Sequence, residues 1–179
     1  MEFGEMLKRL CLAPAPSGYE GECAHVFREL MAPHTEETRI DRMGNVICTL
    51  EGTDPQAPRV MVYAHLDTLG FIVRRVEADG FLQVDRMGGV PEKVLPGLRL
   101  LVRTDGGGFV PGVIGLKSHH ATGPEEKYKV DPVTSLFVDV GAADKAQAEA
   151  MGIGVGCPAI YRPEYTPLWG DRVSATALD

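Results

Sequence analysis

The stretch Val60-Met-Val-Tyr-Ala-His-Leu-Asp67 carries the strongest indication of the fold. Its apolar run is typical of a buried parallel strand, and in open α/β sheets ligands bind just beyond the carboxyl ends of such strands. His65 and Asp67 are two residues apart, so on an extended backbone their side chains point to the same side. A histidine there can bind a metal ion while the carboxylate accepts a hydrogen bond from the other ring nitrogen. The stretch therefore predicts an α/β fold with a metal site at a strand end.

The residues before this strand predict two helices and a hairpin. Apolar side chains recur at helical spacing over residues 5–12, and prolines follow. Ser17-Gly-Tyr-Glu20 matches a capping box, in which the serine oxygen caps a helix and the glutamate reaches back. Residues 38–41 and 46–50 are expected to be strands, joined by a turn at Met43-Gly-Asn45.

After Gly70 the sequence changes to short apolar runs separated by glycine-rich turns, a pattern typical of a small β-barrel or sandwich. A short helix is expected over residues 144–151, and Pro163 and Pro167 indicate a linker. The expected strands are residues 71–76, 81–84, 98–103, 109–114, 136–140, 155–161 and 173–177.

This change of pattern predicts an α/β domain interrupted by a β-rich domain. We expect the first domain to contain residues 1–71 and to be re-entered over residues 164–179. The inserted domain is expected over residues 72–163.

Composition and charge exclude several classes of partner. The 179 residues carry a formal net charge of −7, so the sequence lacks the basic surface that nucleic-acid binding requires. No apolar run approaches the ~20 residues of a membrane-spanning helix. The first residues, Met-Glu-Phe-Gly-Glu, lack the features of a signal peptide, so we expect a cytoplasmic protein. The four cysteines are scattered without a CxxC pair and are expected to be buried, reduced thiols.

Two further groups of residues are candidates for a site, each with a simpler structural explanation. Asp179 follows a β-like run, and its two carboxylate oxygens could bridge two metal ions ~3.5–4 Å apart. Taken alone, it is only a terminal carboxylate, and His65 alone could be a satisfied polar residue at a strand end. His119 and His120 would face opposite ways on one strand, so a loop or interface role is favoured over catalysis. The sequence contains neither a G-x-S-x-G nucleophile elbow nor a Walker loop.

Several short motifs in order resemble the dinuclear metallo-aminopeptidases of the tetrahedral-assembly family, which includes glutamyl and deblocking aminopeptidases and some relatives labelled endoglucanases. The resemblance extends over nearly the whole chain. The motifs are Pro16-Ser-Gly-Tyr-Glu20, Asp41-Arg-Met-Gly-Asn45, Ala64-His-Leu-Asp-Thr-Leu-Gly70, Leu95-Pro-Gly97, Gly112-Val-Ile-Gly-Leu-Lys117, Val138-Asp-Val-Gly141, Met151-Gly-Ile153 and Ala175-Thr-Ala-Leu-Asp179.

The resemblance implies a phosphorylase/peptidase-like α/β sheet domain, present in part, with an inserted small β-barrel dimerisation domain. It implies two divalent metal ions per subunit, zinc or cobalt, with His65 binding one ion and Asp179 bridging both. Asp67 would be the catalytic residue that orients His65. The implied partners are peptide substrates, cleaved from the N-terminus by a metal-activated water, and further copies of the chain, as dimers up to a dodecamer.

The resemblance is to the N-terminal half of the family, whose remaining metal ligands and general-base glutamate come from residues beyond the position of Asp179. Catalytic zinc needs about three protein ligands per ion. We therefore expect the 179-residue chain alone to be inactive. Two alternatives stay open: a non-catalytic assembly or binding module, and a glycosidase, although no obvious pair of carboxylates for glycoside hydrolysis is present.

Overall fold

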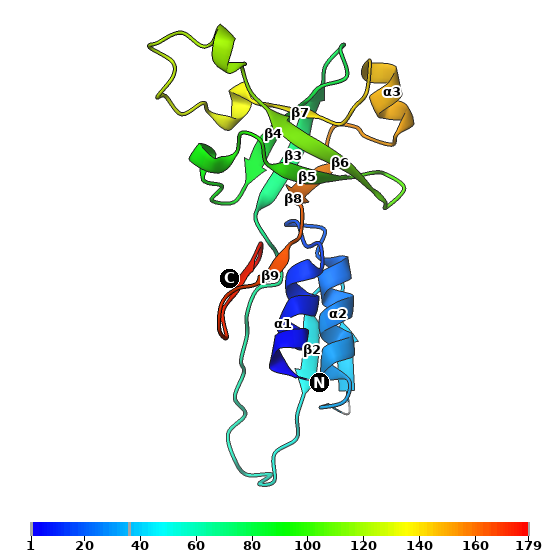
Figure 1. Cartoon of the computed structure of the whole chain (residues 1–179). Coiled ribbons are helices and arrows are strands. Elements are labelled where there is room, and N and C mark those ends of the chain that lie inside the picture. The colour runs from blue at the N-terminus through cyan, green and yellow to red at the C-terminus, as the bar shows by residue number, and fades with distance from the viewer. Residues whose placement is uncertain (1, 36, 179) are drawn as a thin grey trace. The chain divides into compact units, whose positions relative to one another are not determined.

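The computed structural model describes residues 2–35 and 37–178, and its elements fall into two units (Figure 1). The first, here called the helical unit, contains residues 1–68 and 163–179. The second, here called the barrel unit, contains residues 69–162. The sequence analysis placed the corresponding boundaries at 71/72 and 163/164.

Two amphipathic helices organise the helical unit. Helix α1 (Phe3–Leu12) and helix α2 (Gly21–Met31) lie side by side, and Arg9 of α1 forms an ion pair with Glu29 of α2 at 2.6 Å (Figure 1). The side chains buried from these two helices are Cys11, Cys23, Ala24 and Leu30. Burial of one apolar face of each helix explains the helical spacing seen in the sequence.

Two short antiparallel hairpins complete the helical unit. Strands β1 (Glu37–Ile40) and β2 (Val46–Thr49) pair with each other, as predicted. Strands β9 (Tyr165–Pro167) and β10 (Val173–Ala175) form the second hairpin. Strand β9 falls where the sequence analysis expected a linker, because proline is tolerated at the edge of a two-stranded sheet.

The predicted strand at Val60–Asp67 is not formed, and this prediction is wrong for the described structure. Residues 60–67 have no assigned secondary structure, and the side chains of Val60, Met61, Val62 and Tyr63 are 81–91% exposed. An apolar run becomes a parallel strand only when neighbouring strands pair with it on the sheet. Among the described residues, the only sheets of the helical unit are the two antiparallel hairpins, and neither hairpin pairs with this segment.

The predicted capping box at Ser17–Glu20 is also wrong. Helix α2 begins at Gly21, its N-cap is Glu20, and no side chain caps it. The carboxylate of Glu20 instead accepts a hydrogen bond from the backbone N–H of Gly18 at 2.5 Å. The hydroxyl of Ser17 bonds elsewhere in the unit, as described below.

The barrel unit is a closed barrel of six antiparallel strands (Figure 1). Its strands run in the order β3-β4-β7-β6-β5-β8, and β8 pairs with β3 to close the barrel. The barrel prediction is therefore confirmed over the sandwich. The strand bounds are β3 (Gly70–Val76), β4 (Leu82–Met87), β5 (Arg99–Arg103), β6 (Phe109–Gly115), β7 (Phe137–Asp139) and β8 (Pro158–Tyr161).

Alternation along the strands fills the barrel interior. Leu100 and Val102 of β5 are fully buried, and so is Phe71 of β3. This two-residue period is the one expected of strands with one face in a core. Helix α3 (Lys145–Ala150) follows β7 and is capped by Asp144, which accepts a hydrogen bond from the N–H of Gln147 at 2.8 Å. The short 3₁₀ helices are η1 (Glu92–Val94), η2 (His119–Ala121) and η3 (Val133–Ser135).

The Gly112-Val-Ile-Gly115 part of β6 has a packing role in the barrel. A Cβ added at Gly115 would lie 2.2 Å from the ring of Phe137 on β7, and one at Gly112 would lie 2.9 Å from Val138. Any side chain at these positions would require the neighbouring side chains of Phe137 and Val138 to move. The two glycines of this motif are thus explained by the close contact of β6 with β7.

Among the described residues, none of the helices combines the length and apolar character needed to span a bilayer.

Candidate functional site

His65 and Asp67 come together at the end of the extended segment that leads into the barrel. The Nδ1 atom of His65 lies 3.0 Å from the backbone oxygen of Asp67 and 3.2 Å from its carboxylate Oδ1. Both oxygens can only accept, so Nδ1 must carry the ring hydrogen. On a neutral ring this tautomer leaves the lone pair of Nε2 available to a ligand.

The two side chains are accessible to small molecules. The side chain of His65 is 59% exposed and that of Asp67 is 41% exposed. A metal ion, water or substrate group can therefore approach Nε2 from solvent.

A hydrogen bond that the sequence analysis missed involves the second carboxylate oxygen of Asp67. The hydroxyl of Ser17 donates to Asp67 Oδ2 at 2.5 Å. The local motif predicted a helix-capping role for Ser17, because motif and spacing cannot show that residues fifty positions apart meet. The available signal was the presence of a serine in one motif and of an aspartate with a second carboxylate oxygen in another.

The residues present suit one ligand position of a metal site. Nε2 of His65 could serve as a zinc or cobalt ligand. The ring is held through Nδ1, which is hydrogen-bonded to the backbone oxygen of Asp67 and lies 3.2 Å from its carboxylate Oδ1. Over residues 2–35 and 37–178, however, no three His, Cys, Asp or Glu side chains come close enough to hold an ion. Asp179, the predicted bridging ligand, lies outside the described residues.

The vicinal histidines do not join this pair. His119 and His120 lie in the 3₁₀ helix η2, beyond the end of β6, with their ring centroids 5.6 Å apart. Their position in a loop agrees with the loop assignment favoured from the sequence. They belong to the barrel unit, whereas His65 belongs to the helical unit.

The buried thiols are not activated nucleophiles. Cys11, Cys23 and Cys157 are free and buried, and burial raises the pKa of each thiol above its ordinary value. Because the thiolate is the reactive form, a raised pKa suppresses its chemistry at neutral pH. Cys48 lies on β2 and is half-buried. The expectation of buried, reduced thiols is thus confirmed for three of the four cysteines.

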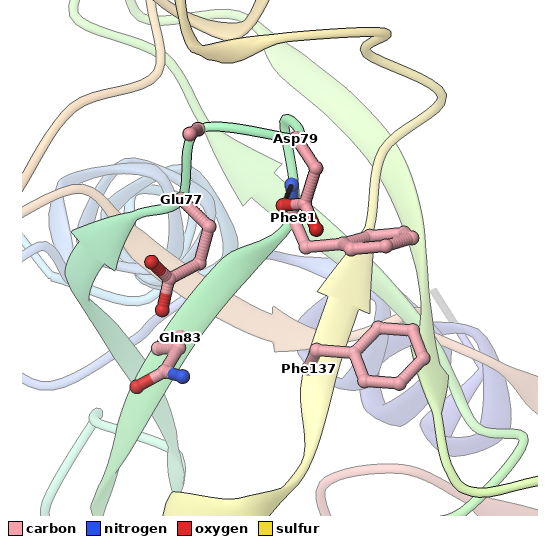
Figure 2. A pocket seen from close by; sticks show the side chains of 6 residues that line it. Glu77, Asp79, Phe81, Gln83 and Phe137 are labelled. Carbon is pink, nitrogen blue, oxygen red and sulfur yellow. Dashed lines mark hydrogen bonds between the residues drawn. The ribbon is translucent and has the colours of Figure 1, made fainter.

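A surface depression in the barrel unit contains two carboxylates, but each is used locally (Figure 2). Glu77 accepts from Arg75 Nε at 2.8 Å, and Asp79 accepts from the N–H of Phe81 at 3.4 Å. Figure 2 shows the rings of Phe81 and Phe137 close together beside this turn. The ring planes are tilted by 46°, and their centroids are 4.6 Å apart. The depression is therefore a hairpin end stabilised by local contacts, and none of the residues around His65 lines it.

Comparison with known proteins agrees with the resemblance drawn from the motifs. The family model described as M42 glutamyl aminopeptidase matches residues 44–179. A lysyl aminopeptidase of Pyrococcus furiosus is 33% identical over 178 residues, which are 98% of this chain and 50% of that protein.

Solved structures of aminopeptidases have the same fold over this length. Aminopeptidase APDkam598 from the archaeon Desulfurococcus kamchatkensis superposes with a TM-score of 0.87 at 39% identity, covering 94% of this chain and 45% of that one. The Pyrococcus horikoshii TET1 peptidase, which can assemble into a tetrahedron or a large octahedral shell, gives 0.84 at 28% identity, covering 98% and 51%. A Thermotoga maritima structure described as an endoglucanase is less similar, with a TM-score of 0.74 at 26% identity, covering 92% and 47%.

The chain thus spans about half the length of the relatives that it matches. Those relatives match it in order across both units, including the barrel. Because the family model covers more than half of its residues, the chain belongs to the M42 glutamyl aminopeptidase family.

Proposed function

We propose that this chain supplies one part of a metal-dependent aminopeptidase, the part that contains His65 and Asp67. The observation that carries the proposal is the contact of His65 Nδ1 with the backbone oxygen of Asp67 at 3.0 Å and with its carboxylate Oδ1 at 3.2 Å. It leaves the lone pair of Nε2 available to a ligand on an exposed side chain. Family membership and relatives named as aminopeptidases support the reaction class.

In this proposal His65 and Asp179 would help to hold two zinc or cobalt ions, His65 through its imidazole and Asp179 through its carboxylate. Two bound metal ions would polarise the scissile carbonyl of the substrate and lower the pKa of a water bound to them. Asp67 keeps the imidazole in the Nδ1–H tautomer, which raises the basicity of Nε2. The general-base glutamate and the other ligands would come from sequence equivalent to the half of the relatives that this chain does not match.

The proposed substrates are peptides with a free N-terminus, cleaved in the cytoplasm. We further propose that copies of the chain associate through the barrel unit into dimers and larger assemblies, up to a dodecamer. The assembly of the P. horikoshii TET1 peptidase supports this.

A chimera tests the proposal. Residues 1–179 would be joined to the half of the P. furiosus lysyl aminopeptidase that this chain does not match, with the intact lysyl enzyme as the parent control. We expect hydrolysis of aminoacyl chromogenic substrates, abolished by EDTA and restored by Co²⁺ or Zn²⁺. Asp67→Asn should lower the activity of the chimera by about 10–100-fold. His65→Ala should lower it to background.

Two results would argue against the proposal. One is a folded chimera that binds metal but releases no amino acid while the parent does. The other is cleavage of cello-oligosaccharides in place of peptides, which would support the glycosidase alternative. The 179-residue chain assayed alone should show no metal-dependent turnover. If the chimera and the 179-residue chain both associate but neither is active, the result would support a non-catalytic module.

A further inference from the structure

We propose that Ser17 is a positioning residue for the candidate site, where it holds the Asp67 carboxylate in the orientation that fixes the ring of His65. This inference rests on the proposed function only because that proposal identifies His65 and Asp67 as parts of a site. The contact itself is a 2.5 Å hydrogen bond from Ser17 Oγ to Asp67 Oδ2. A hydroxyl bonded to a charged carboxylate at this length belongs to the strong class of hydrogen bonds.

The two oxygens of Asp67 have separate partners. Ser17 bonds Oδ2, and Oδ1 lies 3.2 Å from His65 Nδ1. A half-exposed aspartate would otherwise sample several rotamers, and in most of them Oδ1 would leave the imidazole. By fixing Oδ2, Ser17 selects the rotamer in which Oδ1 faces His65.

The loop that presents Ser17 is itself fixed to the segment that contains Asp67. Pro16 and Thr68 form a parallel β-bridge, and the N–H of Thr68 donates to the carbonyl of Ala15 at 2.7 Å. Ala15 and Pro16 are fully buried. The serine hydroxyl is therefore brought to Asp67 by backbone contacts that do not depend on it.

A tight turn directs Ser17 after this bridge. The N–H of Tyr19 donates to the carbonyl of Pro16 at 2.8 Å, and Gly18 has a φ of +84°. Glycine at the third position tolerates this left-handed φ, and the backbone hydrogen bond closes the turn around Ser17. The motif Pro16-Ser-Gly-Tyr-Glu20 thus builds a rigid support for one hydroxyl.

The experiment measures the tautomer of His65 in the metal-free chain. Ring ¹⁵N shifts would be recorded with EDTA at pH 9, where histidine side chains are ordinarily neutral. His65 would be assigned by the signal lost in His65→Gln, since the chain has five histidines. Unmodified protein should give two well-separated ring nitrogens, as expected for one dominant tautomer, and a single χ1 rotamer for Asp67 from its Hα–Hβ couplings.

Ser17→Ala should move the two nitrogen shifts toward each other and average the couplings of Asp67. Ser17→Thr, which retains the hydroxyl, should restore the unmodified values. Thr68→Val is the matched control, because it removes the 3.2 Å bond from the Thr68 hydroxyl to Ala15 O in the same junction without touching Asp67. It should leave the His65 shifts unchanged. Unchanged backbone amide signals at Gly18 and Tyr19 in each variant would show that the turn is intact.

Three results would overturn the role of Ser17. The first is a set of Hα–Hβ couplings that shows several rotamers for Asp67 in the unmodified chain. This result does not depend on whether any variant folds. The second is a Ser17→Ala protein with unmodified His65 shifts, which would mean that the backbone oxygen of Asp67 fixes the ring alone. The third is an equal effect of Thr68→Val, which would assign the effect to the junction. Since none of these readouts uses turnover, they are independent of whether the chimera is a peptidase.

Discussion

Gly18 shows how a single residue determines the geometry around the candidate site. Its φ of +84° lies in the left-handed region, and a Cβ added there would meet nothing within 4 Å. The requirement for glycine is therefore conformational and not steric, because left-handed backbone costs other L-residues about 1–2 kcal/mol. This cost falls on the turn that presents Ser17.

We therefore predict that Gly18→Ala lowers the free energy of unfolding by about 1 kcal/mol. Gly21→Ala is the matched control, because Gly21 begins α2, has no positive φ and also has open space around its Cβ position. That change should be neutral or stabilising, since alanine favours helix more than glycine does. Urea unfolding of both variants would measure the difference. A Gly18→Ala protein as stable as Gly21→Ala would refute the conformational argument.

At the same scale, the sequence predicted one side of the site and missed the other. The spacing of His65 and Asp67 was sufficient to predict that the two residues meet. The hydrogen bond of Nδ1, however, goes to the backbone oxygen of Asp67, and the carboxylate Oδ1 lies 3.2 Å away. Ser17 also matched a local pattern, the capping box, and that pattern gave the wrong partner. Its bond to Asp67 depends on the parallel bridge between Pro16 and Thr68, which no local spacing encodes.

Among the elements, the turn between β1 and β2 has the clearest electrostatic support. Asp41 Oδ1 accepts from the N–H groups of Met43 and Asn45 at 2.8 and 3.0 Å, and Oδ2 accepts from Asn45 Nδ2 at 2.9 Å. The side-chain hydrogen bond from Asn45, together with these backbone bonds, lowers the pKa of Asp41. The motif Asp41-Arg-Met-Gly-Asn45 is thus explained as a turn held by one carboxylate.

We predict that this contribution is lost in acid. A carboxyl whose pKa is lower in the folded state stabilises the fold above its unfolded pKa of about 3.9, and this stabilisation disappears as the pH falls through the folded value. NMR signals of β1 and β2 would follow thermal unfolding of this hairpin between pH 6 and pH 2.5. The midpoint of unmodified protein should exceed that of Asp41→Asn at pH 6, and the gap should shrink below pH 4. A gap that is independent of pH would contradict the role of the charge.

The segment before His65, in contrast, does not form the element that its sequence predicted. Its apolar pattern is that of a buried strand, yet the structure leaves it exposed, because burial depends on neighbouring strands and not on the segment alone. The barrel strands were predicted close to their observed bounds, since each finds its partners within the same unit. Local pattern thus identified an element only where the described chain also supplies its neighbours.

Exposure of this segment makes a quantitative prediction about the 179-residue chain. Met61 is 81% exposed, whereas Leu30 on α2, in the same unit, is 5% exposed. Met61→Ala should change the free energy of unfolding by no more than about 0.5 kcal/mol. Leu30→Ala should cost about 2–5 kcal/mol through lost burial and a cavity. Denaturant unfolding followed by signals from α2 would compare them, and an equal cost would mean that the segment is packed.

On the scale of the whole molecule, the main core belongs to the barrel unit alone. Its buried cluster runs from Phe71 to Ala159, entirely within residues 69–162. The two ends of this unit are adjacent in the sheet, because Phe71 of β3 pairs with Ala159 of β8. The chain therefore enters and leaves the barrel on neighbouring strands, an arrangement that permits an insertion to fold independently.

We accordingly predict that residues 69–162 expressed alone form a folded barrel with cooperative thermal unfolding and dispersed amide signals. A fragment of residues 77–157 is the matched control: it lacks both β3 and β8, so the four remaining strands cannot close, and it should be unfolded. Within the longer fragment, Gly115→Ala should lower the midpoint of thermal unfolding, because the added Cβ would lie 2.2 Å from the ring of Phe137 and that ring would have to move. A disordered 69–162 fragment would mean that the barrel needs the helical unit, and the two units would then fold as one.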